Sequence, residues 1–198
     1  YIDETRTWTS AKGVFGGAVA ELALGLLLGG MRHIAGYARK QEWSEDHGRT
    51  LFGARVTILG AGGIAQSLIS MLKPFNCHIT VVRNREGDVP GADVVLTTSR
   101  LHEALLRADA VLMAIALTPH THGIMGKAEF ELMQSHAWIV NVGRGKQIVT
   151  DDLVWALETG QIGGAALDVT DPEPLPAGHP LWSLPNCIIT PHVGNTAE

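Results

Sequence analysis

From Arg55 onward, short apolar runs alternate with amphipathic segments, and this alternation limits the possible folds more than any other feature. The apolar runs predict buried strands, and the 3.6-residue periodicity between them predicts helices. Strands that alternate with helices at this spacing form right-handed βαβ units around a parallel sheet. We therefore expect an α/β fold with a doubly wound parallel sheet.

The predicted elements cover most of the chain after that point. Strands are expected at Arg55–Leu59, His78–Val82, Ala110–Ile115, Trp138–Val142, Ala165–Val169 and Cys187–Ile189. Helices are expected at Ile64–Lys73, Leu101–Arg107, Lys127–Met133 and Asp151–Thr159. Pro74 would end the first of these helices. We expect Thr150 to cap the last helix and Gly160 to close it. Asp151 and Asp152 would then lie at its positive end.

A further helix is predicted before the alternating part, over Phe15–Arg39. It is apolar on most faces, so we expect it to lie between two layers or two subunits. The apolar run Val14–Met31 is the best candidate for a membrane span, but Glu21 lies inside it and no basic segment precedes it. We therefore expect neither a membrane span nor a signal peptide.

Composition excludes several classes of protein. Apolar residues make up 45% of the 198 residues and charged residues only 18%, which predicts a well-buried globular domain and excludes intrinsic disorder. The net charge of −5 argues against a surface that binds nucleic acid. The two cysteines, Cys77 and Cys187, are too few for a disulfide framework and have no zinc-ligand spacing. A reducing, cytoplasmic setting is the simplest interpretation.

The strongest single motif is a glycine loop between the first predicted strand and its helix. It has the form G-x-G-x-x-A, with Gly60, Gly62 and Ala65 at the fixed positions and Gly63 and Ile64 between them. Gly60 would make the tight turn, and Gly62 would let a pyrophosphate approach the backbone. The helix N-terminus would then offer N–H groups to the phosphates. A doubly wound sheet with this loop is a Rossmann-type dinucleotide-binding domain. The alternative is a purely structural glycine turn.

The end of the second predicted strand bears on the choice of cofactor. An acidic residue there would bind the ribose 2′-hydroxyl of NAD, but the chain has Arg83, Asn84 and Arg85. Two guanidinium groups suit a 2′-phosphate, which an acid would repel. We therefore expect NADP in preference to NAD, with two solvated loop arginines as the alternative.

Four polar residues follow later predicted strands. Arg144, Asp168, Glu173 and His192 all lie at or beyond carboxyl ends of strands. Open α/β sheets bind their ligands at this edge. Each residue has an ordinary alternative, such as a surface charge for Arg144 or a solvated carboxylate for Glu173.

Several ordered motifs carry a family resemblance. They are Val19-Ala20-Glu21 with Arg32, Val149-Thr150-Asp151-Asp152-Leu153, Gly163 to Val169, His179-Pro180-Leu181-Trp182 and Pro185-Asn186, together with the glycine loop. Over nearly its whole length the chain resembles the cofactor domain of the D-isomer-specific 2-hydroxyacid dehydrogenases. The resemblance implies an NAD(P)-dependent enzyme that transfers a hydride between NAD(P)H and a 2-oxo acid or D-2-hydroxy acid.

By that resemblance, Arg144, Glu173 and His192 form the catalytic set. Histidine is a suitable proton donor near neutral pH, and a neighbouring carboxylate favours the imidazolium form. Arg144 would bind the substrate carboxylate and polarise its carbonyl group. In the oxidative direction, neutral His192 would accept the hydroxyl proton.

The resemblance also implies cofactor contacts beyond the glycine loop. They comprise Ala116, Leu117, Val142, Gly143, Arg144, Asp168, His192 and Gly194. The family usually has a proline at the position of Ala116, which leaves the shape of that loop open. Asp168 would lie near the nicotinamide or, alternatively, cap the junction between strand and loop. His120 and His122 have a spacing that can chelate a metal, but without partner ligands we expect no metal site.

Family members have a second, substrate-binding domain. Residues 1–17 would be its edge, and residues 18–198, with the 15–39 helix as linker, would be the cofactor domain. The chain begins at Tyr1 and not at Met, so we expect it to be a piece of a longer protein that binds cofactor but reduces substrate weakly or not at all. The substrate stays open among glyoxylate, hydroxypyruvate, phosphoglycerate and bulkier 2-oxo acids. The expected NADP preference weakly favours a glyoxylate/hydroxypyruvate reductase.

The partners expected are a small 2-oxo or 2-hydroxy acid, with no nucleic acid and no membrane. The resemblance also implies a homodimer formed through the 15–39 helix. The rival function is a non-catalytic dinucleotide sensor of the same fold, as in corepressor relatives. The full set of Arg144, Glu173 and His192 counts against a sensor, because a sensor needs no proton donor.

Overall fold

The computed structural model describes residues 5, 7 and 13–195. Within that part, one sheet contains β1 (Arg55–Leu59), β2 (His78–Arg83), β3 (Val94–Thr97), β4 (Ala110–Met113), β5 (Trp138–Asn141), β6 (Gly164–Leu167) and β7 (Cys187–Ile189). Their order is β3-β2-β1-β4-β5-β6-β7, and every neighbouring pair is parallel. The order reverses between β1 and β4, which is where doubly wound sheets place their ligands. The predicted α/β fold is confirmed.

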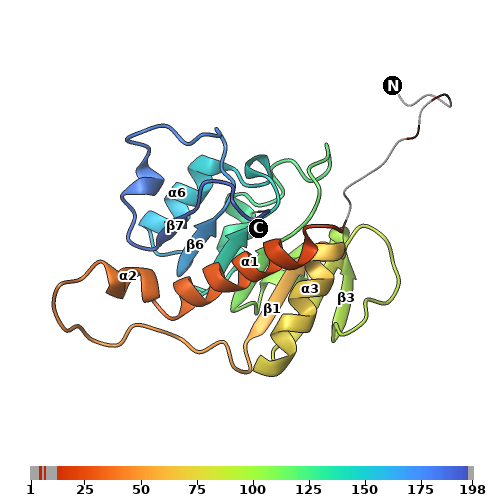
Figure 1. Ribbon diagram of the computed structural model, residues 1–198, viewed down its shortest axis with the longest axis horizontal. Helices are drawn as coiled ribbons and strands as arrows, with labels where there is room; N and C mark the ends of the chain where they lie inside the picture. The colour runs from red at the N-terminus through yellow and green to blue at the C-terminus, as the bar shows by residue number, and fades with distance from the viewer. Residues whose placement is uncertain (1–4, 6, 8–12, 196–198) are drawn as a thin grey trace.

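Helices cover both faces of this sheet. They are α1 (Gly16–Met31), α2 (Ile34–Ala38), α3 (Gly63–Leu72), α4 (Leu101–Leu105), α5 (Lys127–Leu132) and α6 (Thr150–Glu158), with short 3₁₀ turns at Lys73–Phe75, Thr98–Arg100, Gly145–Gln147 and Pro180–Trp182. Figure 1 shows α1 and α3 side by side across one face, where they contact each other and the sheet. The helices α4, α5 and α6 lie in the apolar layer on the other face.

The core therefore consists of two apolar layers, one on each side of the sheet. Ile58 packs with Leu27 and Leu68 in the first layer, and the next residue of β1, Leu59, packs with Phe130 in the second. Alternating side chains of each strand thus enter opposite layers. This double burial explains why the strands are continuous apolar runs in the sequence.

Most predicted boundaries agree with the structure to within one or two residues, but β3 was not predicted. It is a four-residue strand at the edge of the sheet, and a loop, not a helix, connects it to β2. The alternation of strands and helices therefore gave no signal for it.

The prediction of one helix over Phe15–Arg39 is wrong. The helix α1 ends at Met31, and His33 has a left-handed backbone with φ of 55° before α2 begins. Gly30 lies near that end, against the ring of Trp138, where an added Cβ would be 2.2 Å from the ring. A glycine required for close packing also weakens the helix locally. After the break, α2 and the following loop project from the body of the protein (Figure 1).

The predicted capping role of Thr150 is also wrong. The residue before α6 in capping position is Val149, and Thr150 is the first helical residue. Its hydroxyl donates instead to the carbonyl oxygen of Asp171, at 2.7 Å. The closing role of Gly160 is confirmed by its left-handed backbone, with φ of 69°.

Residues 1–17, the predicted edge of a second domain, lie mostly outside the described residues. The boundary at residue 17 stays a prediction. In the described part of the chain, no helix is long and apolar enough to span a membrane.

Candidate functional site

A large open cavity lies at the carboxyl edge of the sheet, beside the point where the strand order reverses. Its volume is about 1290 Å³, above the roughly 300–1,000 Å³ of ordinary small-ligand pockets. Its walls come from the ends of β1, β2 and β4 and from the first turns of α1 and α3. The predicted cofactor residues that line it are Gly60, Gly62, Gly63, Ile64, Arg83, Asn84 and Ala116.

The glycine loop forms one wall, and its two key glycines differ in what surrounds them. Gly60 has φ of 115°, and a Cβ there would be 2.5 Å from the carbonyl oxygen of Ala114. Only glycine fits such a position. At Gly62, by contrast, no atom of another residue lies within 4 Å of the point that a Cβ would occupy, so the space beside its backbone is open. A ligand could therefore approach the main chain closely at Gly62.

The N-terminus of α3 opens into the same cavity. Gly62 precedes the helix without a capping side chain, and Gly63 and Ile64 in the first turn line the cavity. The first N–H groups of a helix have no partner within the helix and carry a partial positive charge. The cavity wall is therefore suited to phosphate.

The end of β2 supplies the charged part of the cavity. Arg83, which is partly buried, and the exposed Asn84 line it, whereas Arg85 does not. Glu86 also lines the cavity, although the sequence motif at the strand end, Arg83 to Arg85, did not include it. The polar residues Thr97, Thr98 and Ser99 were missed because they lie at the end of the unpredicted strand β3 and directly after it.

The loop after β4 forms the opposite wall. Ala116 lies there, and Thr121 fixes the loop because its hydroxyl donates to the carbonyl oxygen of Ala116 at 2.7 Å. Leu117 is 38% exposed. His120 lines the cavity and His122 is exposed, and no group of three or more metal-ligating side chains occurs in the described residues.

Two buried amides hold the turn that carries Arg144. Gln147 accepts from the N–H of Arg144 at 2.9 Å and donates to the carbonyl oxygen of Ile115, which lines the cavity, at 2.9 Å. Asn141 accepts from the N–H of Gly143 and donates to the carbonyl oxygen of Arg144. Asn141 and Gln147 are completely buried, and neither was predicted as a site residue. Polar residues inside an otherwise apolar run were the available signal.

The side chain of Arg144 itself is exposed. One of its terminal nitrogens donates to the carbonyl oxygen of Gly143 at 2.6 Å, which fixes the direction of the side chain. The rest of the guanidinium can donate to a carboxylate. The predicted residues Val142 and Gly143 are buried behind it and do not line the cavity.

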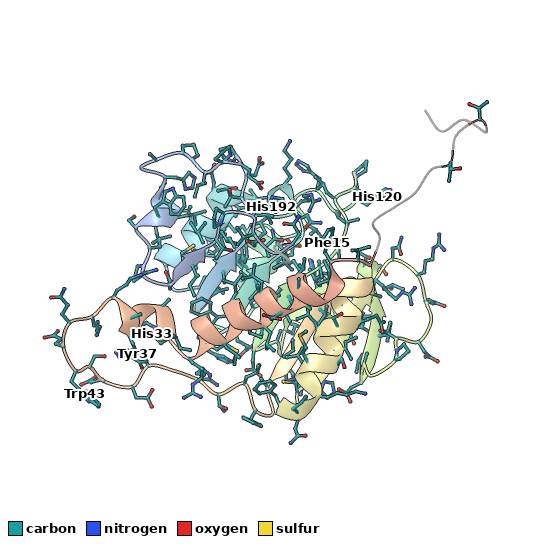
Figure 2. All side chains as sticks on the ribbon, in the orientation of Figure 1. Phe15, His33, Tyr37, Trp43, His120 and His192 are labelled. Atoms are coloured by element: carbon teal, nitrogen blue, oxygen red, sulfur yellow. The ribbon has the colours of Figure 1, made fainter. Side chains whose placement is uncertain are left out.

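His192 and Glu173 lie together, as the sequence predicted for a catalytic pair. Nδ1 of His192 and Oε1 of Glu173 are 2.6 Å apart, and the side chains are 42% and 41% exposed. This contact with the carboxylate fixes the orientation of the ring. The other ring nitrogen remains available to exchange a proton with a bound molecule. Figure 2 shows His192 far from the projecting segment that carries His33, Tyr37 and Trp43.

Asp168 holds the backbone that carries His192. One oxygen of its buried carboxylate accepts from the hydroxyl of Thr190 at 2.6 Å and from the N–H of Val193 at 2.9 Å. The other accepts from the N–H of Gly194 at 2.9 Å. Between these contacts, His192 adopts a left-handed backbone with φ of 54°. Asp168, His192 and Gly194 do not line the large cavity.

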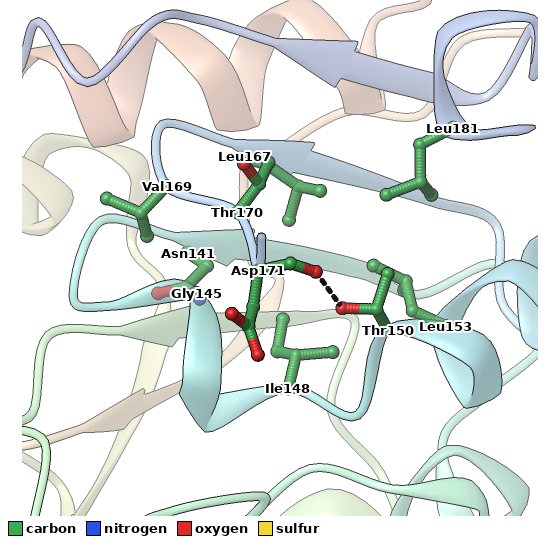
Figure 3. A pocket seen from close by; sticks show the side chains of 10 residues that line it. All are labelled: Asn141, Gly145, Ile148, Thr150, Leu153, Leu167, Val169, Thr170, Asp171 and Leu181. Atoms are coloured by element: carbon green, nitrogen blue, oxygen red, sulfur yellow. Dashed lines mark hydrogen bonds between the residues drawn. The ribbon is translucent and has the colours of Figure 1, made fainter. Parts of the chain in front are cut away.

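The segment before Glu173 packs directly against the Arg144 turn. A Cβ on Gly145 would lie 1.9 Å from the carbonyl oxygen of Thr170, so the two backbones are in contact. Figure 3 shows Thr150 bound to the carbonyl oxygen of Asp171 beside a void of only about 10 Å³. A void of that size has room for about one water molecule. It is therefore a packing gap in the support of the site and not a binding pocket.

The comparisons with known proteins decide the family. Residues 24–194 match the family described as D-isomer specific 2-hydroxyacid dehydrogenase, NAD binding domain. The chain belongs to this family. The resemblance noted in the sequence is confirmed, and the large cavity corresponds to the end of the sheet at which such folds bind dinucleotides.

The matches to individual relatives cover all or most of this chain but only part of the relatives' own length. A protein of the proB 3′ region of Corynebacterium melassecola is 42% identical, over 100% of this chain and 67% of its own. The human glyoxylate reductase/hydroxypyruvate reductase is 35% identical, over 90% of this chain and 57% of its own. The chain thus spans about three fifths of the length of such family members.

A solved structure shows the same architecture. The NADPH-dependent glyoxylate/hydroxypyruvate reductase of Sinorhizobium meliloti, in complex with NADP and sulfate, superposes with a TM-score of 0.84. It is 26% identical, and the match covers 96% of this chain and 61% of that one.

Proposed function

We propose that this chain is the cofactor-binding and proton-transfer part of a D-2-hydroxyacid dehydrogenase of the glyoxylate/hydroxypyruvate reductase type. The observation that carries the proposal is the His192–Glu173 pair, with Nδ1 and Oε1 2.6 Å apart. It lies on the same edge of the sheet as the glycine loop, where the space beside the Gly62 backbone is open. A proton donor poised by a carboxylate is needed for carbonyl reduction. A dinucleotide sensor has no use for one, so the pair favours an enzyme.

The residues of the chain divide the reaction between them. A reduced nicotinamide cofactor, when bound, supplies the hydride. His192 donates a proton to the carbonyl oxygen of the 2-oxo acid as the alcohol forms, and Glu173 orients the ring through its contact with Nδ1. Arg144 binds the substrate carboxylate with the free part of its guanidinium. In the reverse direction, neutral His192 accepts the hydroxyl proton.

The proposed cofactor is NADP(H) in preference to NAD(H). Arg83 lies in the cavity wall at the end of β2, where the ribose of a dinucleotide would reach, and a guanidinium can bind a 2′-phosphate through two hydrogen bonds. Glu86 lines the same part of the cavity and would oppose that phosphate. The balance between Arg83 and Glu86 therefore sets the preference. The NADP complex of the S. meliloti reductase supports the proposal.

A side-by-side fluorescence titration with NADPH and NADH tests this proposal. Arg83→Asp should weaken NADPH binding by about tenfold or more and affect NADH much less, since a charge-assisted contact is lost only with NADPH. Arg85→Asp is the matched control, because it makes the same charge change outside the cavity lining. Equal affinity for the two cofactors in the unaltered chain would refute the NADP preference and leave the dehydrogenase proposal intact.

The chain alone is proposed to bind cofactor but to turn over slowly. Relatives are longer by about two fifths of their own length. Hydride transfer depends on exact positioning and on exclusion of water, while His192 and Glu173 are both about two fifths exposed here. A turnover near the ordinary enzyme value of about 10 s⁻¹ by these 198 residues would refute this part.

A homodimer in the cytoplasm is proposed as the working form. The projecting segment after α1 exposes apolar side chains, with Ile34 54% and Trp43 101% exposed. Such side chains favour burial against a second copy. Cys77 and Cys187 are unpaired, in keeping with a reducing setting. Sedimentation would test the dimer, and a monomer at micromolar concentration would exclude it.

A further inference from the structure

A second cavity, of about 260 Å³, lies at the opposite end of the sheet from the cofactor cavity. It is lined by the first residues of three neighbouring strands, Arg55 of β1, His78 of β2 and Val94 of β3. The end of α4 forms its other wall. This helix has only five residues, so it leaves the amino end of this sheet face uncovered. The two cavities share no lining residue.

Polar side chains occupy the sheet face inside this cavity. Arg55 pairs in register with His78, and Thr57 pairs with Thr80. Residues two apart on a strand point to the same face, so these four side chains form one polar patch. Parallel sheets covered by helices normally present apolar residues there. Thr57 is accounted for, because its hydroxyl donates to the carbonyl oxygen of Ala104 at 2.8 Å. The other three side chains make no such contact in the described part of the chain.

The charged residues that line the cavity are two arginines and one acid. Arg55 and Arg107 both line it, and neither is in an ion pair with a described residue. The carboxylate of Glu103 also lines it, but this group is already bound by Arg100 at 2.6 and 2.9 Å. Among the lining residues, two arginines without an ion-pair partner therefore outnumber one acid that is already paired, in a chain whose net charge is −5.

The imidazole ring of His78 also lines this cavity. Its Nδ1 is buried and has no hydrogen-bond partner among the described residues. Leaving such an atom unpaired is unfavourable, and native proteins mostly avoid it. Because no hydrogen bond fixes the ring, it can turn about its Cβ–Cγ bond and present a nitrogen to a molecule in the cavity.

We propose that this cavity binds a phosphate group, either as free phosphate or as a small phosphomonoester. Guanidinium groups bind phosphate oxygens through paired hydrogen bonds, and Arg55 and Arg107 approach from the sheet and from the end of α4. Thr80 and His78, which also line the cavity, can add further hydrogen bonds. The volume lies below the roughly 300 Å³ at which pockets for drug-sized ligands begin, so the ligand is small. The site goes beyond the dehydrogenase proposal and does not depend on it.

The test is a phosphate titration of this chain followed by amide NMR, at constant ionic strength with chloride as the replacement anion. Site-resolved signals separate this cavity from the glycine loop, which can also attract phosphate. The expected result is a saturable shift at His78, Thr80 and Arg107. A parallel titration with glycerol phosphate distinguishes the two sources: tighter binding of the ester assigns a phosphomonoester, and binding of phosphate alone assigns the free ion.

Matched double variants make the test decisive. Arg55→Gln with Arg107→Gln should weaken binding at these signals by about tenfold or more, since two charge-assisted contacts are lost. Both side chains are exposed, so the variant should fold. Arg39→Gln with Lys40→Gln makes the same charge change on the projecting segment and should leave the affinity unchanged. Absence of a saturable shift, or equal affinity in the first variant, would overturn the proposal.

Discussion

Replacing Asp168 with asparagine tests how the backbone around His192 is held. The buried carboxylate accepts three hydrogen bonds, from Thr190, Val193 and Gly194. The asparagine side chain would keep one acceptor oxygen, but its amide NH₂ would face a backbone N–H or a hydroxyl with the wrong polarity. Hydrogen bonds to charged groups contribute roughly 1.5–3 kcal/mol each, and a buried unsatisfied donor costs about 1–3 kcal/mol. With the asparagine oxygen in the place of Oδ1, the bonds from Thr190 and Val193 are kept and the amide NH₂ faces the N–H of Gly194, so the loss of that one bond should cost about 3 kcal/mol.

The loss appears in one of two measurements. If the 190–194 segment unfolds with the rest of the chain, about 3 kcal/mol lowers the Tm by roughly 6–12 °C at this chain length. If the segment opens by itself, the Tm changes less and the amides of Val193 and Gly194 lose their protection against hydrogen exchange. Either result agrees with the structure.

Thr190→Val is the graded control for this experiment. It removes one donor but leaves the carboxylate with both backbone N–H groups, so the cost should be about 1 kcal/mol. An Asp168→Asn variant with unchanged Tm and unchanged amide protection would refute the view that this carboxylate holds the segment.

Three other predictions concern single positions. Gly60→Ala should destabilise the chain by about 2–3 kcal/mol in a melting curve, because of backbone strain and contact with Ala114. Gly62→Ala should leave the Tm unchanged but weaken cofactor binding in an NADPH titration. Burial raises the pKa of Asp109, but hydrogen bonds from the Arg55 N–H and His136 outweigh it, so the pKa lies below its usual value. This stabilisation is present above the unfolded pKa of about 4 and is lost as the pH falls through the lower folded pKa; urea unfolding should show it vanish in acid for the native chain and be absent from Asp109→Asn. Burial raises the pKa of Cys187 to about 12, so a thiol reagent at pH 8 should not modify it until the chain unfolds.

The main chain topology could be predicted because this sheet is buried on both faces. Strands such as β4 and β5 are apolar throughout or nearly so, and the helices between them have the matching periodicity. The features that were missed depend on tertiary contacts. The edge strand β3 has no helix before it, and α1 ends where Gly30 packs against Trp138, a residue far away in the sequence. Local patterns carry no information on either.

In the candidate site, too, some features could be predicted from local sequence and others depend on tertiary contacts. The position of Arg144, Glu173 and His192 could be predicted because each follows a strand, and parallel strands bring their carboxyl ends to one edge. Their catalytic roles rest on the family resemblance and stay a prediction. Their support could not be predicted so well. Gln147 joins the Arg144 turn to Ile115 across the sheet. That contact depends on the spatial order of β4 and β5 and not on sequence spacing.

The two ends of the sheet expose different groups to a ligand. At the carboxyl edge, loops extend beyond the strands, and Gly60 and α3 leave N–H groups for a ligand. At the amino edge, where such folds usually have no site, the short helix α4 exposes strand side chains themselves. Apolar residues are tolerated in this cavity, since Val94 and Leu96 also line it. The unpaired Arg55 and His78 are therefore the residues for which packing alone offers no reason.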